Sequence, residues 1–197
     1  MKPKSAKASV PKKIRTLKEA HRFVMAVGIC AIFTDRSGRL ASLWDITDLP
    51  EKKPGQKGWG EKIGAVWSWK NRLPADYPDE IFYGKIPGGR AVLMTLDYLR
   101  AVHYPKHHKP IQSCSANAQR LFELVRVEPR GTTELRNLFA GQNRLLRAAF
   151  ARALVELQVT LNVVRLNASE VEADTWVPFQ EQYGWGDVSL DQPYCTS

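Results

Sequence analysis

A β-hairpin that directly follows a helix constrains the fold of this chain more than any other feature of its sequence. Residues 81–86 and 90–96 are apolar runs rich in aromatic and branched side chains, and residues 87–89 (Pro-Gly-Gly) between them are a turn sequence. Residues 61–73 have the apolar spacing of a helix, which Pro74 is expected to end. A helix joined to a hairpin in this way predicts a small module of mixed α and β structure.

The residues before the hairpin supply the other elements of a first module. Thr16 and Glu19 have the spacing of a capping box, and Gly28 is expected to end the helix that the box begins. An apolar run, a short helix and a loop follow, over residues 29–33, 42–47 and 48–60. Helix, short helix, helix and hairpin is the order of a winged helix, in which the third helix contacts DNA and the hairpin forms the wing.

The same order of elements returns in the second half of the chain. Gly141 is the small residue that a tight turn between two helices requires, and Thr132 or Thr133 can cap the first of these helices. The expected helices and strands of this half span 115–127, 134–139, 143–159, 159–166 and 175–179. We therefore predict an α+β, mainly helical fold that consists of tandem winged helix-turn-helix modules with β-hairpin wings.

A linker is expected between the two modules and a disordered arm before the first one. The helical stretch after the hairpin is expected to end near Pro105, and the run of Pro, Lys and His that follows indicates a surface linker. The first residues of the chain are basic and have no apolar periodicity, which is typical of disorder. The predicted boundaries are 1–14 for the arm, 15–105 for the first module, 106–114 for the linker and 115–197 for the second module.

Positive charge extends over the body of the chain and is not confined to its ends. The formal net charge is +9, residues 1–15 carry +6, and residues 167–197 carry −6, so residues 16–166 keep +9. A cationic body attracts polyanions and supplies the salt-dependent part of nucleic-acid binding. Such a charge is also found on proteins whose surface is basic only for solubility. Of these two interpretations, the sequence favours DNA as the partner.

Several other classes of protein do not fit the sequence. There is no run of about 18 uncharged apolar residues, so no membrane span is expected. Cys30, Cys114 and Cys195 lie far apart, which favours reduced thiols and a cytoplasmic location. His103, His107 and His108 indicate a surface stretch more than a metal site, because no nearby Cys or acid completes a ligand set. We therefore expect no cofactor and no metal, and the oligomeric state is left open.

The helix expected over residues 143–159 carries the main candidate interface. Its apolar residues recur three and four apart, and the opposite face bears Arg144, Arg147 and Arg152 with two small alanines between them. Small residues leave room for a groove wall, while arginines reach phosphates or bind guanine with two hydrogen bonds. The alternative is an ordinary solvated helix face.

Five residues of the first module are further candidates for contact with nucleic acid. Lys62, Trp69 and Arg72 are placed on the outward side of the helix over 61–73, where the tryptophan would stack on a base or sugar. The alternative for this tryptophan is packing beneath the wing, which is the interpretation that we favour. Lys85 and Arg90 flank the hairpin turn, where a wing contacts a minor groove or the DNA backbone, or where such charges serve only solubility.

Four short segments of the first module carry a family resemblance, together with the C-terminal helix-turn-helix. They are Gly28-Ile-Cys-Ala-Ile-Phe33, Ser42-Leu-Trp44, Val66-Trp-Ser-Trp-Lys70 and Phe82-Tyr-Gly-Lys85. With these segments the chain resembles the AlkZ-related winged-helix proteins, which are relatives of bacterial DNA glycosylases that unhook interstrand crosslinks. The resemblance covers about residues 16–185, and it implies a tandem winged-helix fold and a role in DNA repair or DNA binding.

The chain departs from the catalytic pattern of those glycosylases. Their motif, just after the first helix, is Gln, any residue, then Gln or Asp, and the matching stretch here has Ala31 and Phe33 at those two positions. Neither side chain can position a water molecule or stabilise a cationic sugar. We therefore predict a non-catalytic protein that binds duplex DNA. The alternatives are a divergent glycosylase and a winged-helix scaffold for protein interactions.

Overall fold

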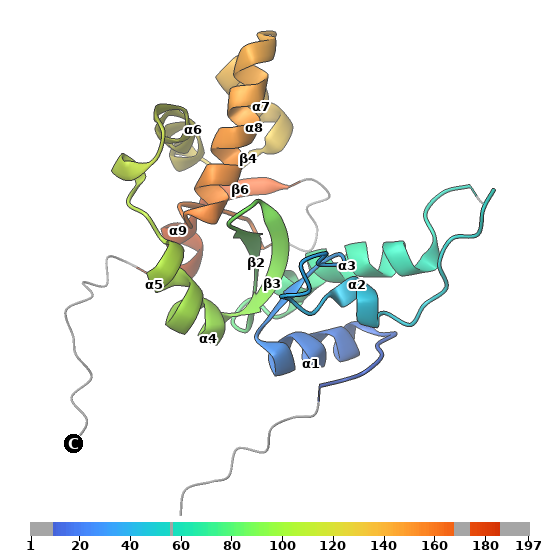
Figure 1. Cartoon of the computed structure of the whole chain (residues 1–197). Helices are drawn as coiled ribbons and strands as arrows, with labels where there is room; N and C mark the ends of the chain where they lie inside the picture. The colour runs from blue at the N-terminus through green and yellow to red at the C-terminus, as the bar shows by residue number, and fades with distance from the viewer. Residues whose placement is uncertain (1–9, 56, 168–173, 186–197) are drawn as a thin grey trace, which may run out of the picture.

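Two three-stranded antiparallel sheets, each accompanied by helices, organise the chain (Figure 1). The structure is a computed structural model, and it describes residues 10–55, 57–167 and 174–185. Over these residues the protein is a mainly helical α+β structure, which confirms the predicted fold class.

Within the described residues, the first half contains three helices and a sheet in the strand order β1-β3-β2. All neighbouring strands are antiparallel, and the hairpin pairs Ile86 with Arg90 across its turn. The elements are α1 (Leu17–Val27), β1 (Ile29–Ala31), α2 (Leu43–Ile46), α3 (Glu61–Asp76), β2 (Ile81–Ile86) and β3 (Arg90–Thr95). The predicted hairpin is confirmed.

The expected end signals of the first helix are present in the structure. The Thr16 side chain accepts a hydrogen bond from the backbone of Glu19, whose carboxylate accepts from the backbone N–H of Thr16, so the capping box is complete. Gly28 ends α1 at φ 75°, a conformation that favours glycine. The chain then enters β1 directly.

Helix α3 continues past Pro74, so the expectation that this proline ends the helix is wrong. Pro74 lacks an N–H, and the helix loses only that one backbone bond. The backbone N–H of Tyr77 donates to the carbonyl of Leu73 at 3.0 Å and closes the last turn. Burial of Leu73 and Pro74 against the first-half core offsets the missing bond.

The segment after the hairpin is helical for longer than expected. It comprises α4 (Leu96–Tyr98), the π-turn Leu99–His103, α5 (Tyr104–His107) and the short 3₁₀ helix Ile111–Ser113. The backbone N–H of Tyr104 donates to the carbonyl of Leu99, five residues earlier, which is the π-helical spacing. Pro105, which has no N–H, comes next in the first turn of α5, where a helix tolerates the loss of that donor. The predicted end of the helix near Pro105 is therefore wrong.

The second half repeats the element order of the first. Its sheet has the strand order β4-β6-β5, which corresponds position by position to β1-β3-β2. The elements are α6 (Ala116–Val127), β4 (Arg130–Gly131), α7 (Thr132–Ala140), α8 (Arg144–Val159), β5 (Val163–Arg165), β6 (Thr175–Pro178) and α9 (Phe179–Tyr183). Helix α8 thus has the place in this half that α3 has in the first.

Two boundaries in the second half differ from the sequence-based expectation. Neither Thr132 nor Thr133 caps α7, because the helix already begins at Thr132 and its N-cap is Gly131. The Thr132 hydroxyl is used elsewhere: it donates to the carbonyl of Asp174 at 3.2 Å and accepts from the indole N–H of Trp176 at 2.8 Å. The strand expected from residue 159 begins at Val163, since α8 runs on to Val159.

The folded part of the chain includes Ile14, the last residue of the predicted arm. Ile14 is fully buried, its N–H donates to the carbonyl of Ile46 at 3.0 Å, and its own carbonyl accepts from Asp48 at 2.9 Å. Pairing of both backbone groups and burial of the side chain explain why this residue is not part of an arm. Residues 1–9 of the predicted arm lie outside the described residues.

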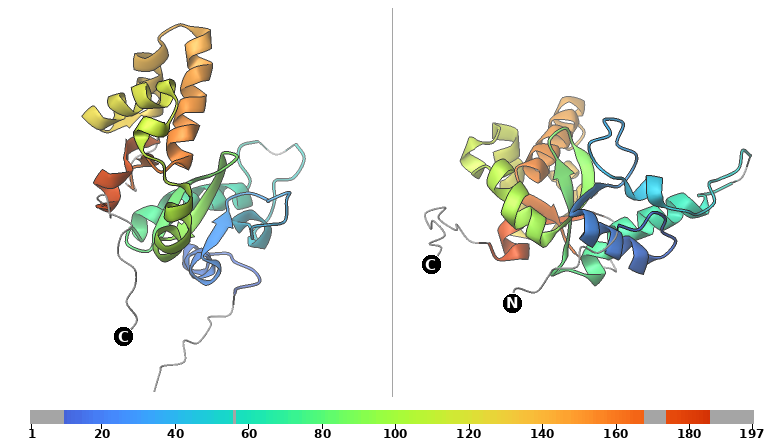
Figure 2. Two further views of the ribbon diagram at one scale, coloured as in Figure 1. Left: turned by 60° about the vertical axis from the view of Figure 1, so that its left-hand side comes forward. Right: turned by 60° about the horizontal axis from the view of Figure 1, so that its bottom comes forward.

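Three hydrophobic clusters form the core of the described part of the chain, and one of them belongs to both halves. The first-half cluster surrounds Phe23 and Trp69, and the second-half cluster surrounds Phe139 and Phe150. The shared cluster consists of Phe82, Val92, Met94 and Leu99 together with Leu161, Val164, Val177 and Phe179. The hairpin β2-β3 also lies beside the C-terminal half of α8, as both views of Figure 2 show.

Candidate nucleic-acid interface

Helix α8 presents the predicted arginine face to solvent. Asn143 caps the helix and accepts hydrogen bonds from the backbone of Leu145 and Leu146. Arg144, Arg147 and Arg152 are exposed. The opposite face is buried in the second-half core through Ala149, Phe150, Ala153, Leu154 and Leu157. The expected orientation of this helix is therefore found in the structure.

The three arginines are held differently. Arg147 donates through Nε to the carbonyl of Gly141 at 3.1 Å and through Nη2 to the side chain of Gln142 at 3.0 Å, so its guanidinium is fixed beside the turn between α7 and α8. Arg144 and Arg152 have neither a hydrogen-bond nor an ion-pair partner among the described residues. Their charge is uncompensated and available to an anion.

The hairpin turn restricts how much of α8 is open. A shallow hollow separates Gly88 and Gly89 from Arg152 and Val155, and a Cβ at Gly89 would lie 3.5 Å from the Val155 Cγ1. The hairpin therefore approaches the C-terminal half of α8 closely. The first turns of α8, which carry Arg144 and Arg147, form the open part of the face.

The two hairpin residues predicted to touch nucleic acid are partly engaged within the protein. Arg90 forms an ion pair with the buried carboxylate of Asp35 at 2.6 Å. Hydrogen bonds from Ser37 and from the backbone of Leu40, together with the charge of Arg90, lower the pKa of Asp35 to about 2. Lys85 is half-buried, and burial lowers its pKa. Arg90 thus holds the loop after β1 to the hairpin.

Helix α3 faces the core with a different side from the one expected. Trp69 is only 6% exposed and packs in the first-half core, and Lys62 is also buried, whereas Trp67 is 42% exposed. The outward position predicted for Lys62 is therefore wrong, and the burial of Trp69 agrees with the favoured interpretation that this ring is packed and does not stack on a base. Residues 62, 66, 69 and 73 follow one another at helical spacing and form the buried side. Arg72 is exposed, as predicted, and pairs with Asp76 at 2.8 Å.

Aromatic side chains gather around α2 and α3, and one of them, Trp59, was not singled out by the sequence patterns. Trp59 is 62% exposed, and its ring meets that of Trp67 edge to face, with centroids 5.5 Å apart. On the other side Phe33 lies against Trp44, with centroids 5.9 Å apart. The position of Trp59 between two glycines of a Lys- and Pro-rich loop was the one available signal in the sequence.

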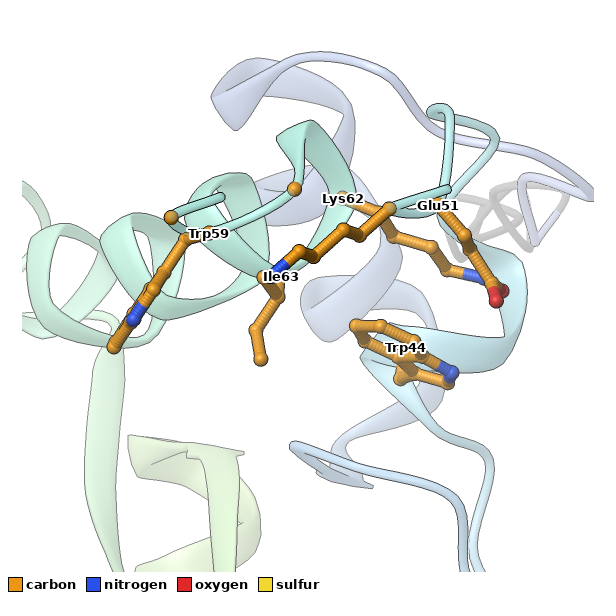
Figure 3. Close-up of a pocket in the computed structure, with 8 residues that line it drawn as sticks. Trp44, Glu51, Trp59, Lys62 and Ile63 are labelled. Carbon is orange, nitrogen blue, oxygen red and sulfur yellow. The ribbon is translucent and has the colours of Figure 1, made fainter. Parts of the chain in front are cut away.

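A hollow of about 350 Å³ separates Trp44 from Trp59. Figure 3 shows the two indoles on opposite sides of Ile63, while the side chain of Lys62 extends toward Glu51. The Lys62 ammonium lies 2.9 Å from the Glu51 carboxylate and 4.5 Å from the centre of the Trp44 ring. We call the site formed by Trp44, Trp59, Glu51, Lys62 and Ile63 the tryptophan slot.

Two cations from different halves of the chain, Lys70 of α3 and Arg165 of β5, both contact the ring of Tyr83. The ammonium of Lys70 lies 4.9 Å from the centre of the Tyr83 ring, and the guanidinium of Arg165 lies 4.6 Å from it. Lys70 is only 4% exposed, and burial together with the charge of Arg165 lowers its pKa to about 8. Asp174 is the acid that pairs with Arg165, at 3.5 Å.

The two positions predicted to correspond to the glycosylase motif are occupied by apolar side chains in the structure. Ala31 is fully buried in β1 and pairs with Val92 of β3. Phe33 is 42% exposed and leans against Trp44. Asp35, a buried acid two residues further on, uses its carboxylate to hold its own loop and Arg90. Neither motif position offers a group that could activate water.

Histidine and cysteine side chains do not gather into a metal-binding group within the described residues. His103 and His107 are adjacent on the continuous helix, with ring centroids 4.5 Å apart, and burial lowers the pKa of His103 to about 4. Cys30 and Cys114 are buried free thiols, and Cys195 lies outside the described residues. Among residues 10–55, 57–167 and 174–185, no three His, Cys, Asp or Glu side chains are grouped to hold a metal ion.

Comparison with known proteins places this geometry in a family context. The family described as AlkZ related matches residues 14–194, which is most of the chain. No curated protein and no solved structure matches it significantly. Within the described part of the chain, none of the helices combines the length and apolarity needed to cross a membrane.

Proposed function

The chain belongs to the AlkZ-related family, and from this premise we propose that it is a non-catalytic, tandem winged-helix protein that binds duplex DNA. Family membership relates it to proteins of DNA repair. The repeated element order, with the strand order 1-3-2 in both sheets, supports the winged-helix assignment. In this assignment α8 is the helix that enters a major groove, α3 has the equivalent place in the first half, and the hairpins correspond to wings.

The observation that carries this proposal is the uncompensated positive face at the start of α8. Arg144 is exposed and has no partner among the described residues, and Arg147 is fixed beside it at the helix-turn-helix turn. Arginines at the N-terminal end of a recognition helix contact phosphates and base edges in the major groove. Small side chains at Ala148 and Ala151 allow the helix to approach a groove wall.

Salt dependence of duplex binding tests the proposal directly. The protein is titrated with a fluorescently labelled duplex at several salt concentrations, and the logarithm of the association constant is plotted against that of the salt concentration. We expect a straight line with a negative slope, of magnitude about 0.9 for each phosphate that the protein contacts. A measurable affinity that does not change with salt would contradict contact through arginines.

The non-catalytic part of the proposal rests on Ala31 and Phe33. Incubation with alkylated or crosslinked DNA is expected to leave no abasic sites, because no polar group stands at the two motif positions. The product is assayed by alkaline strand cleavage, with a known glycosylase as the positive control. Excision that Asp35→Asn abolishes would show that the divergent-glycosylase alternative is correct.

A further inference from the structure

The tryptophan slot has features of a ligand site that the duplex-binding face of α8 does not explain. Trp59 exposes 62% of its surface, although a tryptophan that only stabilises a fold is normally covered. Its ring meets that of Trp67 in a T-shaped arrangement, and Trp59 also lines the hollow. Trp44 and Trp59 both line this hollow, and the side chain of Ile63 lies between them (Figure 3).

The loop that carries Trp59 is held in place and is not simply an extended tail. A Cβ at Gly60 would lie 2.8 Å from the backbone nitrogen of Lys52, so only glycine permits the close approach of the two chain segments. The backbone N–H of Lys62 also donates to the carbonyl of Pro50 at 3.2 Å. The base of the loop is therefore closed, and Trp59 is presented from a fixed position.

The edge of the slot carries both a hydrogen-bond acceptor, the Glu51 carboxylate, and a hydrogen-bond donor, the Lys62 ammonium. The Glu51 carboxylate accepts from the Lys62 ammonium at 2.9 Å, and it has further lone pairs for an amino group. A carboxylate accepts from the exocyclic amino group of cytosine, whereas the ammonium donates to carbonyl or ring-nitrogen acceptors. Lys52 also lines the hollow, which places a second cation within reach of a phosphate.

From this arrangement we infer that the tryptophan slot holds an unpaired nucleobase of the bound DNA. The inference rests on the proposed DNA binding and names the form of DNA that the protein prefers: a duplex with an extrahelical base. An aromatic ring stacks on a nucleobase of any identity, while Lys52 at the rim of the hollow would contact a phosphate of its backbone. A base inside an intact stack cannot enter the slot, because both of its faces are already covered by neighbouring bases.

Three probes test the inference: a fully paired duplex, the same duplex with one bulged base, and a short single strand. The parent protein is expected to bind the bulged duplex about tenfold more tightly than the paired one, which corresponds to the stacking of one base. Tryptophan fluorescence should be quenched by the bulged duplex and the single strand, and much less by the paired duplex.

The variants separate stacking from folding. Trp59→Ala should remove the preference for the bulged duplex and leave the affinity for the paired duplex within about twofold, because exposed substitutions cost little stability. Trp59→Phe should restore part of the preference, since it keeps an aromatic face. Val127→Ala is the matched control: this side chain is 72% exposed at the end of α6, outside the slot, and its loss should change nothing.

The outcomes distinguish this inference from the duplex proposal. Equal affinity of the parent for bulged and paired duplexes would overturn the slot while leaving duplex binding intact. Binding of the single strand that depends on Trp59, without binding of the paired duplex, would support the slot and overturn the duplex proposal. A preference for the bulge that survives Trp59→Ala would also overturn the slot, because the base would then be held elsewhere.

Discussion

Helices α3 and α8 have equivalent places in the two halves, yet they present different chemistry to solvent. In α3 the cations are committed within the protein: Lys62 pairs with Glu51, Arg72 pairs with Asp76, and Lys70 is buried. In α8, Arg144 and Arg152 have no partner in the described part of the chain. Helix α3 instead exposes the aromatic ring of Trp67 beside the paired Arg72.

This difference teaches that repeated topology fixes where a helix lies but not what it binds. The same strand order positions both helices against a three-stranded sheet. Unpaired guanidinium groups suit the phosphates of a duplex, whereas exposed indoles suit the faces of unstacked bases. On our proposals, the two halves divide one DNA ligand between them, α8 contacting the duplex and the region around α3 contacting an unpaired base.

The largest expected effect concerns which face of α3 supports the fold. Trp69→Ala should lower the free energy of unfolding by about 3–5 kcal/mol, because the indole is buried in the first-half core. Trp67→Ala should cost less than about 1 kcal/mol, since that ring is 42% exposed. Urea denaturation of both variants measures the difference. Equal losses would contradict the assignment of the buried face.

A smaller effect is expected from the buried cation of α3. The pKa of Lys70 is lowered to about 8, so the unfolded chain binds the proton more tightly than the folded one between pH 8 and the ordinary value of 10.5. Stability should therefore rise with pH across this window, by as much as about 3 kcal/mol relative to Lys70→Met. Below pH 8 the charged lysine is a constant cost, and Lys70→Met should be more stable than the parent.

The matched variant in the second half sharpens the comparison. Arg152→Met removes an exposed cation from α8 and should leave the free energy of unfolding within about 0.5 kcal/mol of the parent at every pH. Thermal melts of the parent and the two variants from pH 7 to 10.5 give the profiles. Parallel profiles for the parent and Lys70→Met would show that Lys70 titrates normally in the folded state.

Local signals in the sequence predicted much of this fold. The capping box at Thr16, the turn at residues 87–89 and the arginine face of α8 are each determined by residues close together in the chain, and all three are found. Most large apolar residues of α8 recur three and four apart on one side, so spacing identified its buried face, although Leu145 is 81% exposed. Repetition of the element order followed from these signals without any repeat of residue identity.

The misplaced features depend on contacts that are distant in sequence. Both sides of α3 carry a tryptophan and a lysine, so spacing alone could not decide that Trp69 is buried and Trp67 exposed. Ile14 is ordered only because it pairs with the backbone around α2. The tryptophan slot was not predicted because Trp59 comes from a loop without periodicity, and its partner Trp44 comes from another element.

The central claim, that the outward face of α8 binds the duplex, is tested with two triple variants of equal charge. The first removes the three arginines of α8, and the second removes three exposed cations of α1, α5 and α6. The substitutions are Arg144→Ala, Arg147→Ala and Arg152→Ala in the first variant and Lys18→Ala, Lys106→Ala and Arg126→Ala in the second. Melting curves of both should stay close to that of the parent, since all six side chains are exposed.

The deciding measurement is the salt dependence of duplex affinity for these two variants beside the parent. We predict that the α8 variant binds much more weakly and that its slope is shallower by about one unit for each lost phosphate contact. The control variant should keep a slope close to that of the parent, because its cations lie away from the outward face of α8. An α8 variant with the parent's affinity and slope would show that this helix does not contact the duplex.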